Sequence, residues 1–137
     1  MMQINRPTIT FQNIAGDWKS SPRIPIISEE QLKTLMAGLS EGEPGIVEFE
    51  SSENDRLQLG IGGPFACAQF TTNECLSRYL CAKAKTVRAT KDVEFLCGGT
   101  PTPIAPELCL SFEVAFKIAD YFIRTGNRDP SVDWVEV

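Results

Sequence analysis

The sequence predicts an α+β fold, in which an antiparallel sheet of about five to seven strands carries two main helices, at about residues 28–40 and 112–125, packed on one face. Apolar residues recur at helical spacing in those two stretches, whereas the region between them consists of short runs that alternate apolar and polar residues. The connections between these runs are too short for parallel crossovers, so the strands should be antiparallel. We expect residues 1–137 to form one domain, because a chain of this length can bury a single core.

The first predicted helix has a clear start and a clear end. Residues 28–31, Ser-Glu-Glu-Gln, form a capping-box pattern, and residues 42–45, Gly-Glu-Pro-Gly, stop the helix. Upstream, residues 7–14 alternate and indicate a first strand, while residues 15–27 contain a tryptophan and two prolines and are expected to form a connector. The apolar positions at helical spacing are Leu32, Leu35, Met36 and Leu39.

The middle of the chain predicts a β-hairpin and then further strands. Residues 46–50 and 56–61 alternate on either side of a polar turn at 51–55, so they should pair. Val47 and Phe49 would face the core. The opposite face, solvated or open to a partner, would carry Glu48, Glu50, Arg56 and Gln58. Further strands are expected at residues 65–70, 76–84, 93–97, 108–110 and 132–135.

The second predicted helix follows a Pro-rich loop at residues 101–106. Ser111 is a good N-cap, Gly126 fits the left-handed position after the last turn, and Pro130 prevents continuation. We expect Trp134 to pack against the domain and hold its C-terminal end. The apolar stripe of this helix is Ala115, Ile118, Ala119 and Phe122.

The charge and hydropathy of the chain argue against two classes of ligand. The chain carries 13 basic and 18 acidic residues and a net charge of −5, whereas direct binding of nucleic acid needs clusters of Lys and Arg. This charge is compatible with a basic protein partner, and equally with solubility alone. No apolar run approaches the roughly 20 residues that span a bilayer. The N-terminus also lacks a signal-peptide pattern, so we expect a cytoplasmic protein without membrane contact.

No catalytic group stands out in the sequence. The chain contains no histidine, which removes the conventional Ser–His and Cys–His nucleophile systems. The glycine-rich residues 60–64 lack the Lys-Ser/Thr of a phosphate loop and predict a turn. Tyr79 and Tyr121 fit interface anchors and core residues equally well. We expect reduced, mostly buried thiols and no metal or cofactor, since no CxxC spacing occurs among Cys67, Cys75, Cys81, Cys97 and Cys109.

Three motifs, taken in order, resemble those of a known family. They are the leucines of the first helix, the run Leu-Gln-Leu-Gly-Ile-Gly at residues 57–62, and a C-terminal order of Gly-Gly turn, Pro-rich stretch, Phe-x-x-Thr-Gly, Pro and Trp. In this order and spacing, residues 28–137 resemble the first-numbered family of immunity proteins of bacterial polymorphic toxin systems. The turn at Arg128 and Asp129 is slightly longer than the family pattern. The matched C-terminal residues, which we expect to be structural, are Gly98, Gly99, Phe122, Gly126, Pro130 and Trp134.

The resemblance implies a non-enzymatic inhibitor that binds and neutralises a cognate toxin. Such toxins are commonly nucleic-acid cytidine deaminases, whose pocket must admit a base and its flanking backbone, so a protein that covers this pocket would exclude the substrate. An acidic inhibitor would also match the basic surface of such a toxin. Loops at residues 98–106 and 127–133 could serve as the interface. The residues we predict to contact the toxin are Glu48, Glu50, Glu53, Asp55, Arg56 and Gln58.

Two other hypotheses stay open at this point. Five thiols allow a small-ligand-binding or thiol-dependent domain without a toxin partner, in which a lysine or a helix N-terminus would have to activate the cysteine. A scaffold or oligomerising domain is the third hypothesis. The sequence leaves the oligomeric state open.

Overall fold

The computed structural model describes residues 9–14, 23–26, 28–41, 45–62, 64–72, 75–97 and 100–136. The strands are β1 (Ile9–Ile14), β2 (Arg23–Ile26), β3 (Gly45–Ser51), β4 (Arg56–Gly62), β5 (Phe65–Thr72), β6 (Cys75–Lys83), β7 (Val93–Cys97), β8 (Thr100–Ile104) and β9 (Asp133–Glu136). The helices are α1 (Glu29–Glu41), α2 (Phe112–Thr125) and the short 3-10 helix η1 (Pro106–Leu108). Within the described residues, a seven-stranded antiparallel sheet has the order β2-β1-β3-β4-β5-β6-β9, and β7 and β8 form a separate hairpin. The predicted α+β class is confirmed.

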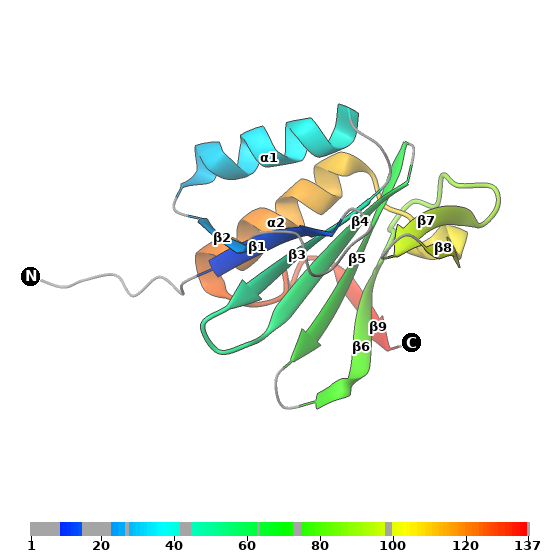
Figure 1. Ribbon diagram of the computed structural model, residues 1–137. Helices are drawn as coiled ribbons and strands as arrows, with labels where there is room; N and C mark the ends of the chain where they lie inside the picture. Colours follow the sequence, from blue (N-terminus) through cyan, green and yellow to red (C-terminus); the bar gives the residue numbers. More distant parts are fainter. Residues whose placement is uncertain are drawn as a thin grey trace, which may run out of the picture.

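The two helices lie on one face of the large sheet, as predicted (Figure 1). Helix α2 packs on β4 and β5, and α1 contacts α2. The β7–β8 hairpin lies on the other side of the sheet, at one end, and packs against β3 and β4 (Figure 1). No helix among the described residues is long and apolar enough to cross a membrane.

The main core lies between the sheet and the helices. Alternation in β3 and β4 places Val47, Phe49, Leu57 and Leu59 on the helix face, where each is at most 1% exposed. Burying one such side chain contributes about 1.5–3 kcal/mol, so the alternation decides which face of each strand turns inward. The stripe of α2 that packs against them consists of Ala115, Ile118, Ala119 and Phe122.

Both helices are capped as the sequence predicts. The Ser28 Oγ accepts a hydrogen bond from the Gln31 N–H at 3.2 Å, and the Ser111 Oγ accepts one from the Val114 N–H at 3.3 Å. These bonds satisfy donors that the first turn leaves without helical partners. Helix α2 ends at Gly126, whose φ of 76° is left-handed and costs glycine little.

A glycine in the middle of β4 allows the hairpin to approach the sheet. An added Cβ at Gly60 would lie 2.7 Å from the Cys67 Sγ and 3.2 Å from the Phe95 Cδ1. Phe95 is fully buried there, in a second hydrophobic cluster that includes Ala89 and Cys109. The sequence predicts a turn at residues 60–64, but Gly60 itself pairs within the sheet, opposite Cys67.

The connector predicted at residues 15–27 is wrong for residues 23–26, which form β2. Pro25 favours irregular structure when the sequence is considered alone, but β2 is the edge strand of the sheet. An edge strand tolerates proline because only one of its sides must donate hydrogen bonds. The rest of the predicted connector, residues 15–22 and 27, lies outside the described residues.

The Pro-rich loop predicted at residues 101–106 is also largely wrong. Residues 100–104 form β8, with Pro101 opposite Leu96 and Pro103 opposite Glu94. The two prolines are two residues apart, so both lack an N–H on the same side, and the remaining N–H groups can pair with β7. The short strand predicted at 108–110 reduces to a single bridge between Leu110 and Ala66, after η1.

Candidate functional site

Polar side chains line part of the sheet face that points away from the helices. They form two rows across β1, β3, β4 and β5, because the strand register sets their members opposite one another. Unlike the core face, these positions carry no large apolar side chain. The first row is Gln12, Glu48, Gln58 and Gln69, and the second is Thr10, Glu50, Arg56 and Thr71.

Glu48 is buried within this face, at 3% exposure, so the expectation that its side chain would be solvated is wrong. Its Oε2 accepts a hydrogen bond from the Gln58 Nε2 at 2.9 Å. A buried carboxylate needs such donors, because unpaired burial of a charge costs several kcal/mol. The Glu48 side chain therefore contributes a hydrogen bond within the polar face and has little contact with solvent.

The other predicted interface residues lie at the exposed end of the same hairpin. Glu50 and Arg56 form an ion pair, with the Arg56 Nε 3.0 Å from the Glu50 Oε2. The turn between them is tight, since Asn54 has a φ of 66° and the Ser51 Oγ accepts from the Asp55 N–H at 3.2 Å. We call β3, this turn and β4 the acidic hairpin. Its charged side chains are Glu48, Glu50, Glu53, Asp55 and Arg56.

The C-terminal motif is tied together by one aromatic side chain on β5. The Phe70 ring lies 6.0 Å from the ring of Phe122 and 6.2 Å from that of Trp134, edge-on in both cases. The guanidinium of Arg128 lies 5.6 Å from the centre of the same ring. The Trp134 Nε1 donates to the carbonyl oxygen of Asp129 at 3.0 Å, which links the last strand to the turn after α2.

The turn after α2 is itself held by a buried carboxylate. Asp129 is 3% exposed, and its Oδ1 accepts from the N–H and the hydroxyl of Ser131 at 2.9 and 2.7 Å. Pro130 is exposed between them. Gly98 and Gly99, the other motif residues, lie outside the described residues.

The family profile described as Immunity protein Imm1 matches residues 23–136, which is most of the chain. The chain belongs to the Imm1 family. The expectation of an immunity protein that acts against a toxin is therefore confirmed at the level of the family. No curated protein matches the chain significantly.

Two thiols of this Imm1 protein, those of Cys81 and Cys109, are poorly suited to nucleophilic chemistry. Cys67 and Cys81 are half-buried and Cys109 is buried. Burial raises the pKa of the Cys81 thiol and is also the largest cause of the raised pKa of Cys109. At neutral pH both are protonated, and the protonated thiol is a weak nucleophile. Among the described residues, no three Cys, Asp or Glu side chains converge to hold a metal ion.

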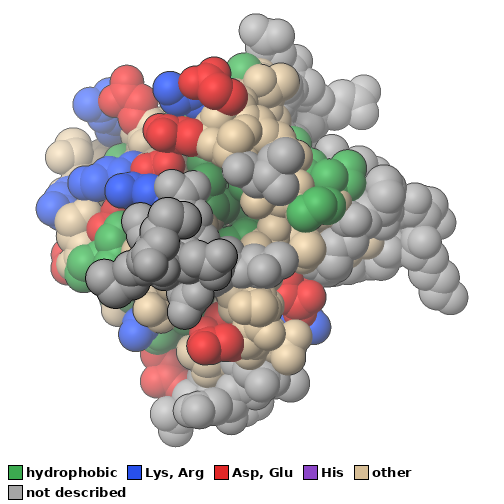
Figure 2. All heavy atoms as spheres, turned by 90° about the vertical axis from the view of Figure 1, so that its left-hand side faces the viewer, with side chains coloured by type: hydrophobic (Ala, Val, Ile, Leu, Met, Phe, Trp, Pro, Cys, Tyr) green, Lys and Arg blue, Asp and Glu red, His purple; other side chains and the backbone are tan. Residues whose placement is uncertain are grey.

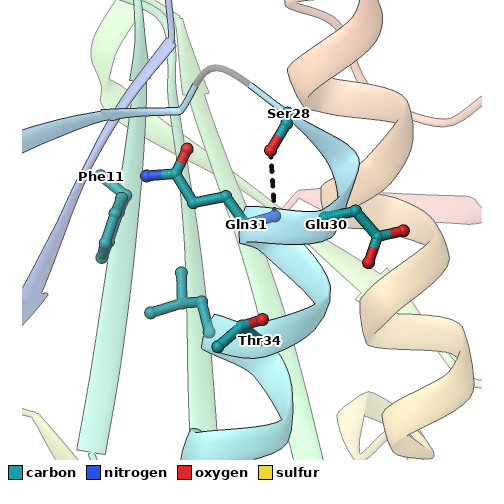
Figure 3. Close-up of a pocket in the computed structure, with 6 residues that line it drawn as sticks. Phe11, Ser28, Glu30, Gln31 and Thr34 are labelled. Atoms are coloured by element: carbon teal, nitrogen blue, oxygen red, sulfur yellow. Dashed lines mark hydrogen bonds between the residues drawn. The ribbon is translucent and has the colours of Figure 1, made fainter.

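One open pocket lies between the start of α1 and β1 (Figure 3). It encloses about 560 Å³, and Figure 3 shows the Gln31 side chain pointing toward Phe11 while Glu30 points away. The Gln31 Nε2 donates to the Pro25 carbonyl oxygen at 3.0 Å, so this amide links α1 to the edge strand β2. The remaining lining residues are Ser28, Thr34 and Leu35. Among the described residues that line the pocket, Glu30 is the only charged one.

The connection between β6 and β7, residues 84–92, is a surface feature that none of the sequence motifs predicted. We call it the basic loop, because it carries Lys85, Arg88 and Lys91 and only one acid, Asp92. All four side chains are exposed. Val87, between them, is 50% exposed. The sequence signal that could have identified this loop is its three basic residues in a chain of net negative charge.

Proposed function

We propose that this Imm1 protein neutralises its toxin by binding over the toxin's active site, and that the toxin is a basic nucleic-acid cytidine deaminase. The immunity protein itself performs no catalysis and binds no nucleic acid. It acts in the cytoplasm, where such a toxin meets its substrate. Membership of the Imm1 family supports the immunity role, and the resemblance described above motivates the class of toxin.

The acidic hairpin is the observation that carries the proposed mode of binding. Between residues 45 and 62 the chain has four carboxylates and one basic residue, a net charge of −3. Glu53 is exposed at the tip and Asp55 is half-exposed beside it. An enzyme that binds nucleic acid needs positive charge next to its pocket, because it must hold phosphates. The hairpin offers the opposite charge on a rigid support.

Covering the pocket would inhibit the toxin by exclusion. A deaminase must take a base out of its stack and into a narrow pocket, together with the backbone on either side. A protein seated over that entrance leaves no room for the strand. Complementary charge would also speed association by about tenfold or more at low salt, which matters for an inhibitor that must act before the toxin does.

Two experiments test the proposal. One uses the purified toxin domain that is encoded beside this protein, and the other measures the survival of cells that co-express the toxin domain and this protein. We expect co-expression to restore survival, a stable complex to form, and inhibition of cytidine deamination to be competitive with the nucleic-acid substrate. A complex without inhibition, or a toxin of another chemistry, would contradict the proposed mechanism while leaving the family assignment intact.

Charge reversal then tests the interface. The variant Glu53→Lys/Asp55→Lys should slow association with the toxin about tenfold or more at low salt. The matched control is Glu30→Lys/Glu113→Lys, which changes the net charge equally on the helix side of the molecule. Equal association rates for the two variants would show that the acidic hairpin is not the contact surface.

A further inference from the structure

The basic loop is held in place at both ends of its exposed tip. At one end, the Ala84 N–H donates to the Glu107 carbonyl oxygen at 2.8 Å. At the other, Ala89 is 8% exposed and packs in the second hydrophobic cluster with Phe95 and Cys109. The four residues between these anchors, 85–88, are all exposed. The tip is therefore held at both ends, so it would lose less conformational entropy on binding a partner than a loop without such anchors would.

The tip combines an exposed hydrophobic side chain with exposed basic side chains. Val87, at 50%, is the most exposed large hydrophobic side chain among the described residues. On the helices, Lys33 lies 3.9 Å from a carboxylate oxygen of Glu30, and Arg124 lies 2.9 Å from one of Asp120. Figure 2 likewise shows acidic and basic side chains interleaved on the face at the left of Figure 1.

Unlike Lys33 and Arg124, the basic side chains of the loop have no such partner among the described residues, a property they share with Lys83 and Lys117. Within the part of the chain that the structure describes, no ion pair includes Lys85, Arg88 or Lys91. The loop carries a net charge of +2 in a chain of net charge −5, so the rest of the molecule carries −7. Positive charge around an exposed valine is the composition of a contact site, because the charges can attract carboxylates of a partner and the valine can bury its apolar surface against it.

The basic loop and the acidic turn lie at opposite ends of the sheet. Strand β5 is antiparallel to both β4 and β6, so β4 and β6 run in the same direction. The acidic turn precedes β4 and the basic loop follows β6, so they lie at opposite ends of these strands (Figure 1). A strand of the length of β4 spans roughly 20 Å. A standard interface of about 800 Å² per partner is about 30 Å across, so one partner can contact both ends.

We propose that the basic loop is a second contact site for the cognate toxin, in which its basic side chains bind carboxylates on the toxin and Val87 enters an apolar depression among them. This inference rests on the proposed function, since the toxin is its partner. With opposite charges at its two ends, the polar face sets the direction in which the toxin docks as well as its affinity. A toxin turned end for end would meet like charge at both ends.

Binding kinetics with the purified toxin domain test this inference. Neutralising the loop should weaken binding about tenfold or more and reduce its dependence on salt, whereas an equal loss of charge on the helices should change binding less than about twofold. The loop variant is Lys85→Ser, Arg88→Ser and Lys91→Ser. The matched control variant is Lys33→Ser, Lys117→Ser and Arg124→Ser. Equal affinities for the two variants would overturn the inference, and circular dichroism would verify that both remain folded.

A single substitution examines the apolar part. Val87→Asp should raise the dissociation rate about tenfold, whereas Ile24→Asp, at another exposed hydrophobic residue, should not. Wild-type protein that fails to bind the toxin would overturn the proposed function together with this inference. Toxin binding that depends on Glu53 and Asp55 but not on the loop would overturn this inference alone. Loop-dependent binding of a DNA oligonucleotide, or loop-dependent dimerisation of the protein by itself, would also overturn it.

Discussion

Substituting Gly60 by alanine should destabilise the protein by pushing the β7–β8 hairpin away from the sheet. The new Cβ would lie 2.7 Å from the Cys67 Sγ and 3.2 Å from the Phe95 Cδ1, whereas relaxed contacts lie at about 3.5–4.0 Å. Phe95 is fully buried and Cys67 sits directly opposite in the sheet, so neither can withdraw freely. Overpacking of this kind costs about 1–3 kcal/mol.

The backbone effect of the substitution has the opposite sign. Alanine favours a strand over glycine by about 0.5–1 kcal/mol, because glycine loses more freedom on folding. The net loss of unfolding free energy should therefore be about 0.5–2 kcal/mol, or about 2–8 °C in Tm for a chain of this size. Urea unfolding followed by tryptophan fluorescence would measure it.

A double-mutant cycle identifies the cause of that loss. Removing the sulfur atom with Cys67→Ala should restore part of the stability of Gly60→Ala, with a coupling energy of at least about 0.5 kcal/mol. Cys67→Ala by itself is the control. A Gly60→Ala variant as stable as the wild type would refute the argument that Phe95 needs a bare backbone beneath it.

Four further predictions concern the C-terminal motif and the thiols. Gly126→Ala should cost about 1 kcal/mol in urea unfolding, because φ is 76° there, and Gly126→Asn should cost less. Trp134→Phe keeps a ring against β5 but loses the hydrogen bond to the Asp129 carbonyl, so we expect a loss of about 1 kcal/mol, and no loss would show that this bond contributes nothing. Cys81 and Cys109, whose pKa values burial raises, should react with a thiol reagent at pH 7 far more slowly in the native than in the urea-unfolded protein. Their raised pKa also favours the folded state while the thiols are protonated, so unfolding free energy should fall as pH rises through about 8.5 and above.

Elements whose signals are local can be predicted from the sequence alone. Helix α2 follows from the Ser111 cap, the apolar stripe and Gly126, and each of these acts within a few residues. The β3–β4 hairpin follows from alternation and a polar turn, and its register sets Glu48 opposite Gln58 and Glu50 opposite Arg56. Local signals suffice here because a cap, a turn or an alternating run restricts the backbone with little reference to the rest of the chain.

Long-range packing decided the rest. Prolines predicted irregular structure at β2 and β8, but both are edge strands, and only the strand order shows that an edge can tolerate the missing N–H groups. Burial of Glu48 depends on neighbouring strands, and its charge alone predicted a solvated side chain. The basic loop is presented because Ala89 packs with Phe95 and Cys109, residues from two other segments. Such contacts join residues far apart in the chain, and no pattern along the sequence encodes them without the tertiary structure.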